Sequence, residues 1–207
     1  MFETGLSGPI EWAVAGQPLP DENESGDGWV VAETVGATLF GVIDGLGHGH
    51  WAAVAAGQAA SVLRENPAEP LNALFVLCHQ ALSGTRGAAI TLGVIDHSQA
   101  TLEWLGVGNV AGSVVRASPA GPTVRSSVML RGGVIGHQLS GVLRPEKTSI
   151  QPGDVVLFGT DGLRSGFDDR PDLSQSAGAL AQGILARCAK GIDDALVLVA
   201  RYRWGTR

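Results

Sequence analysis

The sequence predicts an α+β fold in which antiparallel sheets are flanked by helices. Three observations lead to this prediction. Short β-prone runs outnumber helical segments, the two kinds do not alternate regularly, and 30 of the 207 residues are glycine, which favours frequent tight turns. A parallel doubly wound sheet would require a helix between successive strands. Because the chain has no internal repeat and no long linker, we expect one domain spanning 1–207.

The first half of the chain is expected to contain strands followed by two helices. β-prone runs cover 11–15, 29–34 and 37–43, and the last two are predicted to form a hairpin. Apolar residues then recur at helical spacing over 51–64 and 71–82. Both segments are therefore predicted to be helices with one buried face.

The second half returns to β structure. We expect a three-stranded meander over 89–95, 101–105 and 113–117, followed by strands at 123–130, 142–150 and 155–158. A helix over 173–190 precedes a last strand at 195–202. The sequence of that last strand, ALVLVARY, is apolar enough to be buried on both faces.

Composition excludes several classes of protein. The 44% hydrophobic content and mean hydropathy of +0.17 are typical of a globular chain, and a net charge of −6 argues against nucleic acid as the main partner. No signal peptide and no membrane span is evident, so we expect a cytoplasmic protein. Cys78 and Cys188 lie in helical patterns and are expected to be small core residues.

Four acidic turns lie beside β-prone runs. Their sequences are SGDG, DGLGHG, GTDG and IDDA, and they contain Asp27, Asp44, Asp161 and Asp193. A single Asp-Gly pair is usually only a turn. Hard divalent cations, however, prefer carboxylate and carbonyl oxygens, and a neighbouring glycine lets a main-chain carbonyl approach. Together the four turns predict a site for two Mn²⁺ or Mg²⁺ ions, which would activate water for attack on phosphorus.

The order of these motifs resembles a known family. SGDGW, GVIDGLGHG, TRGAAITLGVID, GVGNV, GDVVLFGTDGL and DDALVLV follow one another as in the metal-dependent protein phosphatase (PPM) superfamily, in its SpoIIE-like branch. The resemblance covers about 27–199 and is greatest to the RsbX-like stressosome phosphatases. It implies a four-layer α-β-β-α sandwich, hydrolysis of phosphoserine or phosphothreonine, and phosphorylated STAS-domain stressosome proteins as substrates.

The resemblance also implies roles for individual residues. Asp44 corresponds to the carboxylate that bridges both metals, and the carbonyl of Gly45 binds one of them. Asp161 and Asp193 complete the shell of one metal, whereas Asp27 reaches the other. Two neighbouring acids are also weighed: Glu24 could compete with Asp27, and Asp194 is expected to be structural.

The sequence departs from the wider superfamily at two functional positions. Leu46 occupies the place of a histidine that protonates the leaving oxygen in many eukaryotic members, so His48, two residues on, is a candidate general acid beside metal-bound water. The N-terminal phosphate-binding arginine has no counterpart. Arg86, in the turn after the second predicted helix, is our candidate replacement, because a guanidinium pairs well with phosphate oxygens.

Two other functions compete with this one. The run Gly45–Gly49 lies between a predicted strand and a predicted helix, as a dinucleotide-binding loop would, but its third glycine is one position early and Asp44 would repel pyrophosphate. A catalytically inactive phosphatase fold acting as a binding module is the other alternative. The presence of all four main aspartates favours an enzyme over such a module.

Overall fold

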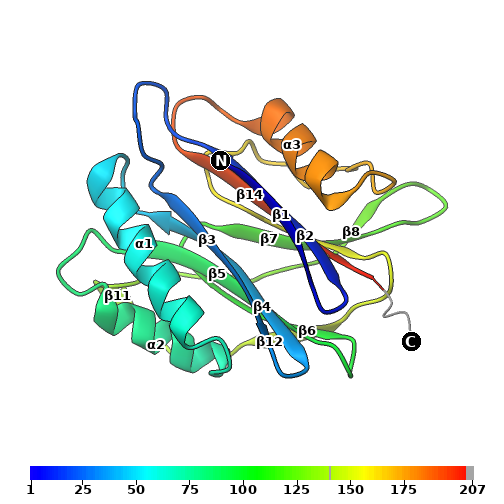
Figure 1. Ribbon diagram of the computed structural model, residues 1–207, viewed down its shortest axis with the longest axis horizontal. Coiled ribbons are helices and arrows are strands. Elements are labelled where there is room, and N and C mark those ends of the chain that lie inside the picture. Colours follow the sequence, from blue (N-terminus) through cyan, green and yellow to red (C-terminus); the bar gives the residue numbers. More distant parts are fainter. Residues whose placement is uncertain (140, 204–207) are drawn as a thin grey trace.

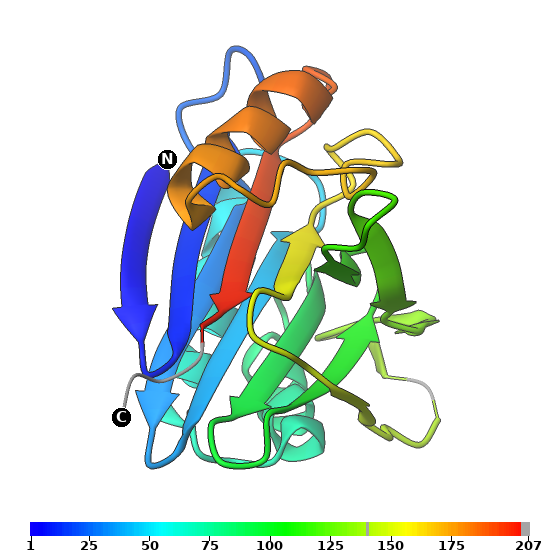
Figure 2. The ribbon, with the colours of Figure 1, turned by 90° about the vertical axis from the view of Figure 1, so that its right-hand side faces the viewer.

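Two β-sheets pack face to face, and helices cover the outer face of each sheet (Figures 1 and 2). This architecture is seen in a computed structural model, which describes residues 1–139 and 141–203. It is the expected α+β arrangement, a four-layer α-β-β-α sandwich.

The first sheet is antiparallel and contains both the first and the last strand of the chain. Its strands run in the order β1 (Phe2–Ser7), β2 (Ile10–Gln17), β14 (Ala195–Tyr202), β13 (Val155–Gly159), β7 (Ala111–Arg116) and β8 (Thr123–Ser127). Helix α3 (Ala177–Cys188) covers β2 and β14. As expected, β14 is buried along nearly its whole length, because it lies between this helix and the other sheet.

The second sheet carries the hairpin predicted near the N-terminus. Its order is β12 (Glu146–Ser149), β6 (Thr101–Val107), β5 (Ala88–Asp96), β4 (Ala37–Gly45) and β3 (Asp27–Thr34), with β9 (Leu130–Arg131) parallel to β6. Helices α1 (His50–Glu65) and α2 (Leu71–Ala81) cover its outer face. A small separate ribbon pairs β10 (Gly133–Val134) with β11 (Gln138–Leu139).

Three apolar clusters hold the four layers together. Between the sheets, Phe40 of β4 stacks on Phe158 of β13, with ring centroids 5.3 Å apart. The inner face of α1 is largely alanine, which lets the helix approach β3 and β4 closely. A third cluster joins α3 to β2, β13 and β14. The sheets are therefore fixed rigidly relative to one another.

The structure corrects three expectations from the sequence and adds one strand. The predicted meander is wrong at its third strand, because β7 leaves β6 and pairs with β13 and β8 in the other sheet. Gly108 makes this crossing possible, since it has a φ of +99° and a Cβ there would come within 2.3 Å of the Cβ of Ala89. Strand β1 was not expected, because its largely exposed sequence shows no clear alternation.

The other two corrections concern element ends. Helix α3 begins at Ala177 instead of 173, because the hydroxyl of Ser176 accepts a hydrogen bond from Ala179 N and caps the helix. The strand expected over 142–150 is confined to β12. Both Cys78 and Cys188 are free and buried, as expected, and burial raises the pKa of the Cys78 thiol to about 12.

No helix within the described ranges, 1–139 and 141–203, is long and apolar enough to span a membrane.

Candidate metal centre

One end of the sandwich collects the four acidic turns. Asp27 opens β3, Asp44 lies near the end of β4, and the antiparallel register places these two residues directly opposite each other. Asp161 follows β13, and Asp193 precedes β14. Because β13 and β14 are also antiparallel neighbours, the end of one and the start of the other lie at the same edge.

Buried hydrogen bonds join the two sheets at this end. Thr160 Oγ1 donates to Asp27 Oδ2 at 2.9 Å, and the same hydroxyl accepts from Leu196 N at 2.9 Å. The turn before β3 is therefore tied to the turn after β13 through one threonine. Sequence reasoning missed Thr160, although it directly precedes the aspartate of the GTDG turn.

Asp194 makes a second connection and has the structural role expected for it. Its Oδ1 accepts from Leu19 N, and its Oδ2 accepts from Gly26 N, both at 2.8 Å. The side chain is buried, so each of these charge-assisted bonds replaces lost hydration. Asp194 thereby holds the loop that leads into Asp27, whereas Asp193 is left partly exposed beside it.

The carboxylates at this end repel one another. Burial, reinforced by the charges of Asp161 and Asp193, raises the pKa of Asp44 to about 7. Burial, followed by the charge of Asp44, also raises the pKa of Asp27 well above its ordinary value, although the Thr160 hydroxyl opposes this shift. Asp44 is thus the acid that interacts with the carboxylates on both sides of it.

This arrangement fits divalent cations in its chemistry. The four carboxylates lie close enough to repel one another, and main-chain carbonyls lie nearby. Carboxylate and carbonyl oxygens are the donors that Mn²⁺ and Mg²⁺ prefer. Among the described residues, no three His, Cys, Asp or Glu side chains already converge on one point. Asp161 Oδ2 instead accepts from Asn109 Nδ2 at 2.8 Å, so a bound cation would have to compete with this hydrogen bond.

Two glycines keep the backbone close to the carboxylates. A Cβ on Gly45 would lie 2.2 Å from the carbonyl oxygen of Ala52, so no side chain fits between β4 and the first turn of α1. A Cβ on Gly162 would lie 1.8 Å from the carbonyl oxygen of Asp194. Gly45, whose carbonyl is a candidate ligand, is therefore required sterically as well.

Asn109 and Lys190 are further side chains that sequence reasoning did not assign. Asn109 lies within GVGNV, and its amide hydrogen-bonds Asp161 and also lowers the pKa of Asp44. Lys190 Nζ donates to the carbonyl oxygen of Asp161 at 2.5 Å. The place of Asn109 in the GVGNV motif before a strand was the one local signal for it, and nothing local in the sequence pointed to Lys190.

The candidate histidine lies on the rim of the centre. His48 is exposed, and its Nδ1 is 2.8 Å from Glu22 Oε1. Glu24, considered as a rival to Asp27, is instead paired with His50 Nδ1 at 3.2 Å. The loop before β3 therefore contributes Asp27 to the interior and two glutamates to the surface histidines.

Arg86 lies beside the loop that follows β4. Leu46 N donates to the carbonyl oxygen of Gly87 at 3.0 Å, which ties the two loops together. A Cβ on Gly47 would come within 2.7 Å of Arg86 Nη1. The structure thus brings Arg86 next to the DGLGHG loop, and the guanidinium has no ion-pair partner in the part of the chain that is described.

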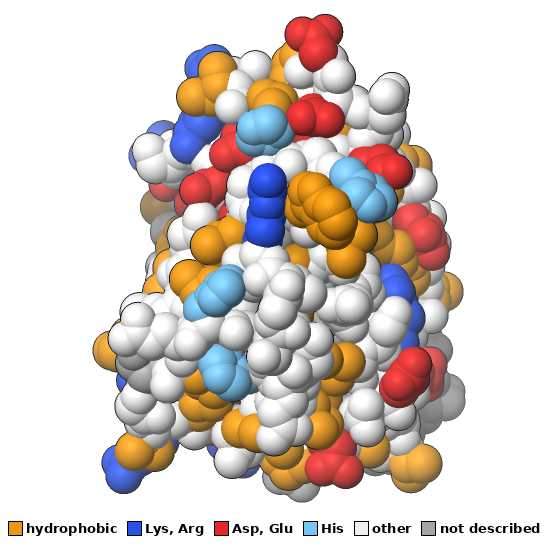
Figure 3. Space-filling view, turned by 90° about the vertical axis from the view of Figure 1, so that its left-hand side faces the viewer, with side chains coloured by type: hydrophobic (Ala, Val, Ile, Leu, Met, Phe, Trp, Pro, Cys, Tyr) orange, Lys and Arg blue, Asp and Glu red, His pale blue; other side chains and the backbone are white. Residues whose placement is uncertain are grey.

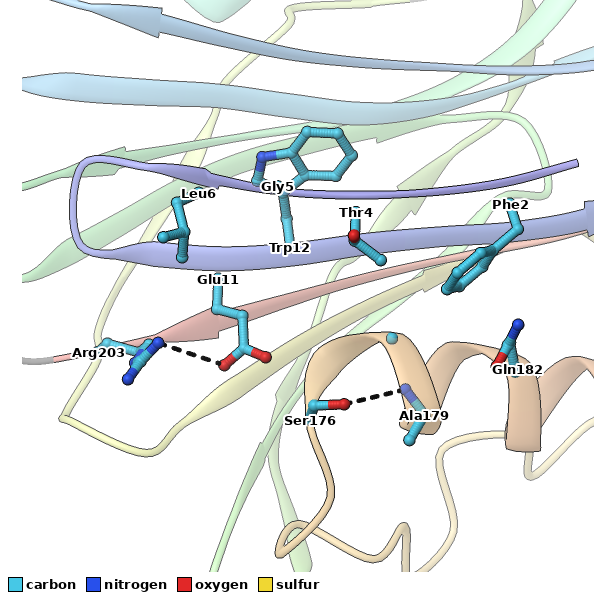
Figure 4. A pocket seen from close by; sticks show the side chains of 11 residues that line it. Phe2, Thr4, Gly5, Leu6, Glu11, Trp12, Ser176, Ala179, Gln182 and Arg203 are labelled. Carbon is cyan, nitrogen blue, oxygen red and sulfur yellow. Dashed lines mark hydrogen bonds and ion pairs between the residues drawn. The ribbon is translucent and has the colours of Figure 1, made fainter.

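A hollow of another kind lies away from these acids. About 810 Å³ in volume, it lies between β1, β2 and the start of α3 (Figure 4). Its one acid, Glu11, accepts from Ala177 N at 2.9 Å and lies 3.9 Å from Arg203 Nη1. Because that carboxylate is already engaged, this hollow does not resemble a site for cations.

The dinucleotide alternative loses its structural basis. A dinucleotide-binding glycine loop connects a strand to a helix within a parallel βαβ unit. Here β4 pairs antiparallel with both β3 and β5. Within the Gly45–Gly49 loop, Gly45 instead lets α1 approach β4, whereas Gly47 lies beside Arg86 and Gly49 beside Glu22.

Comparison with known proteins gives consistent matches over most of the chain. The family model described as stage II sporulation protein E (SpoIIE) matches residues 34–203. A structure solved in work on the bacterial stressosome, a modular system adapted to control secondary messenger signalling, is 29% identical, with a TM-score of 0.81 over 93% of this chain and 99% of the other. A search of curated proteins gave no significant match.

Two further solved structures are similar. The crystal structure of RsbX in complex with magnesium is 19% identical, with a TM-score of 0.80 over 97% of this chain and 99% of that one. The PP2C phosphatase domain of SpoIIE from Bacillus subtilis is 18% identical, with a TM-score of 0.78 over 97% of this chain and 65% of that one. At these identities the two structures establish a shared fold.

Replacing Asp44 should stabilise the metal-free protein. Folding raises the pKa of Asp44 from 3.8 to about 7. Below about pH 4 the carboxyl is protonated in both the folded and the unfolded protein and costs no stability, whereas above about pH 7 it is ionised in both and the folded protein bears the full penalty. We expect Asp44→Asn to raise the free energy of unfolding at pH 8 in EDTA by on the order of 2 kcal/mol. Urea denaturation measures this, with Asp21→Asn as an exposed control; a less stable Asp44→Asn protein would contradict the repulsion.

The neighbouring acids Asp193 and Asp194 should respond differently to alanine. Asp194→Ala leaves two main-chain N–H groups without their acceptor and should cost about 2–4 kcal/mol of stability. Asp193→Ala should cost less than about 1 kcal/mol but weaken Mn²⁺ binding at least about tenfold. Urea denaturation and titration calorimetry with Mn²⁺ separate the two effects. Equal losses of stability would refute the division of roles.

Proposed function

This chain belongs to the SpoIIE family, and on that basis we propose that it is a metal-dependent protein phosphatase acting on phosphoserine or phosphothreonine. Its fold is that of the PPM-type serine/threonine phosphatases, in the SpoIIE-like branch, as the sequence motifs indicated. The observation that supports the proposal is the placement of Asp27, Asp44, Asp161 and Asp193 at one end of the sandwich, where the charges of Asp161 and Asp193 help to raise the pKa of Asp44.

The aspartates would hold two divalent cations, Mn²⁺ or Mg²⁺. When bound, these ions would activate a water molecule for in-line attack on phosphorus. Asp44 is the best candidate for the shared ligand, because its charge interacts with Asp161 and Asp193 and also with Asp27. The magnesium found with RsbX supports a divalent ion at this fold. We assign the carbonyl of Gly45 as a further ligand.

The remaining residues would position the phosphate and its leaving group. Arg86, unpaired among the described residues and next to Gly47, can bind phosphate oxygens from the rim. His48 is held by Glu22 and exposed to solvent, so it is oriented but not enclosed. An acid in this position contributes less than one in a site that excludes water, and we assign His48 a secondary role.

The substrate is proposed to be a phosphorylated protein of a stressosome, of the STAS-domain type. Support comes from the similarity to a structure from stressosome work and to RsbX. We further propose that residues 1–207 act as one phosphatase domain. A catalytically inactive binding module of the same fold is the alternative, and it predicts no hydrolysis with any divalent cation.

Asp44→Ala should abolish hydrolysis while the protein stays folded. We expect the wild-type protein to hydrolyse p-nitrophenyl phosphate and a phosphoserine peptide in the presence of Mn²⁺, and the variant to fall to background at every Mn²⁺ concentration, because the shared ligand is lost. Circular dichroism checks folding. Full activity in the variant would refute the bridging role, and an inactive wild type would favour the binding module.

His48→Ala should have a modest effect. If solvent or a metal-bound water protonates the leaving oxygen, kcat should fall by less than about tenfold, whereas loss of an essential general acid costs about 10²-fold or more. The measurement compares kcat for a phosphoserine peptide with kcat for p-nitrophenyl phosphate, whose leaving group needs little protonation. A loss of about 10²-fold confined to the peptide would make His48 the general acid.

A further inference from the structure

A second hollow lies beside the loop that follows Asp44, and no candidate metal ligand lines it. It has a volume of about 430 Å³ and is lined by Trp51, Val54, Gly84, Thr85 and Arg86. Trp51 and Val54 come from the first turns of α1, and the other three residues come from the loop between α2 and β5. The hollow therefore lies between the helix that follows the Asp44 loop and the turn that carries Arg86.

The lining combines two apolar side chains, one threonine and one cation. Trp51 is 63% exposed, which is unusual for so large an apolar residue. Thr85 Oγ1 donates to Leu82 O and accepts from Gly87 N, so its hydroxyl is already satisfied inside the turn. What Thr85 can offer a ligand is chiefly its methyl group. Arg86 is then the one charged side chain that lines the hollow.

Both walls of the hollow are held in place by contacts of their own. The ring of His50 packs edge-on against Trp51, with centroids 5.2 Å apart, and His50 is itself paired with Glu24. On the opposite wall, the Leu46–Gly87 hydrogen bond fixes the Arg86 turn to the Asp44 loop. Both sides of the hollow are thus held by contacts to the loops around the acidic end.

The surface on the side where α1 begins mixes charged and apolar side chains. Figure 3 views the molecule from the side on which α1 begins, and a Lys or Arg side chain there lies against a large hydrophobic side chain, with histidines and acidic side chains around them. An apolar group that binds on this face would contact a cation at one edge of its site. A cation beside an apolar surface suits a ligand that carries an anionic group close to an apolar group.

We propose that this hollow binds an apolar side chain of the substrate protein, located within two residues of the phosphorylated serine or threonine. The inference rests on the proposed function. Arg86 lies between the hollow and the Gly47 loop, so a phosphate held by its guanidinium places the flanking residues over Trp51 and Val54. Successive Cα atoms are about 3.8 Å apart. Two residues of substrate are therefore long enough to reach from a phosphate at Arg86 to an apolar side chain over Trp51.

The occupant is a segment of substrate, because the geometry ties the apolar walls to the phosphate-binding cation. A nonspecific apolar contact would not require a guanidinium at its edge. Trp51 and Val54 therefore determine specificity, whereas Arg86 serves both the phosphate and the hollow.

The test is a set of phosphoserine peptides in a Gly/Ser background. One peptide has no large apolar residue, and four others carry a single leucine at one or two positions before or after the phosphoserine. With Mn²⁺ and wild-type protein, we expect leucine in at least one position to raise kcat/KM about tenfold, because its burial favours binding. Trp51→Ala should bring this leucine-to-no-leucine ratio close to one.

Two variants make the result specific to the hollow. Trp51→Phe keeps an aromatic wall and should retain most of the ratio. Val35→Ala removes an exposed apolar side chain from the far turn of the β3–β4 hairpin and should leave the ratio unchanged. Because each ratio is measured within one protein, a general loss of activity in a variant does not mimic the effect.

The outcomes separate this proposal from the one on which it rests. A wild-type protein inactive on every peptide and on p-nitrophenyl phosphate would refute the phosphatase function itself. An active wild type with a ratio near one, or a Trp51→Ala variant that keeps the wild-type ratio, would overturn the hollow alone. A change of oligomeric state in Trp51→Ala, seen by light scattering with the ratio intact, would assign the surface to a second copy of the chain instead.

Discussion

The acidic end of this protein depends on the hydrogen bonds that the carboxylate of Asp194 accepts. Apolar packing around Phe40 and Phe158 holds the space between the sheets, and buried hydrogen bonds join the two sheets at the end that carries the acids. Asp194 binds the main chain of Leu19 and Gly26, and Thr160 binds Asp27. These polar links set the loop before β3 in place, so the position of Asp27 follows from them.

The same end of the molecule contains a conflict between stability and function. Burial and mutual repulsion make ionised Asp27 and Asp44 costly, and nothing within the described protein neutralises them fully. Lys190 reaches only the main chain of Asp161, and Arg86 stands on the rim. The β3–β4 register nevertheless holds Asp27 and Asp44 opposite each other, because the hairpin is fixed along its whole length. Divalent cations are the natural means of relieving such a cluster.

Local patterns in the sequence were sufficient for much of the fold and for the acids themselves. Helix α1 and strand β14 have apolar patterns that burial enforces, and the Asp-Gly turns follow directly from residue type. The crossing of β7 to the other sheet could not be predicted, because pairing is decided by partners far along the chain. The same holds for the site: Thr160 meets Asp27 across 133 residues, and Asn109 meets Asp161 across 52.

The two cysteines have a practical consequence for studying this molecule. Cys78 lies on the buried face of α2 and Cys188 at the end of α3, and both thiols are shielded from solvent. A thiolate is the reactive species in alkylation, and the raised pKa of Cys78 keeps it protonated at neutral pH. A fluorescent or spin label could therefore be attached to a cysteine introduced on the rim of the acidic end, with the native thiols left in place as silent background.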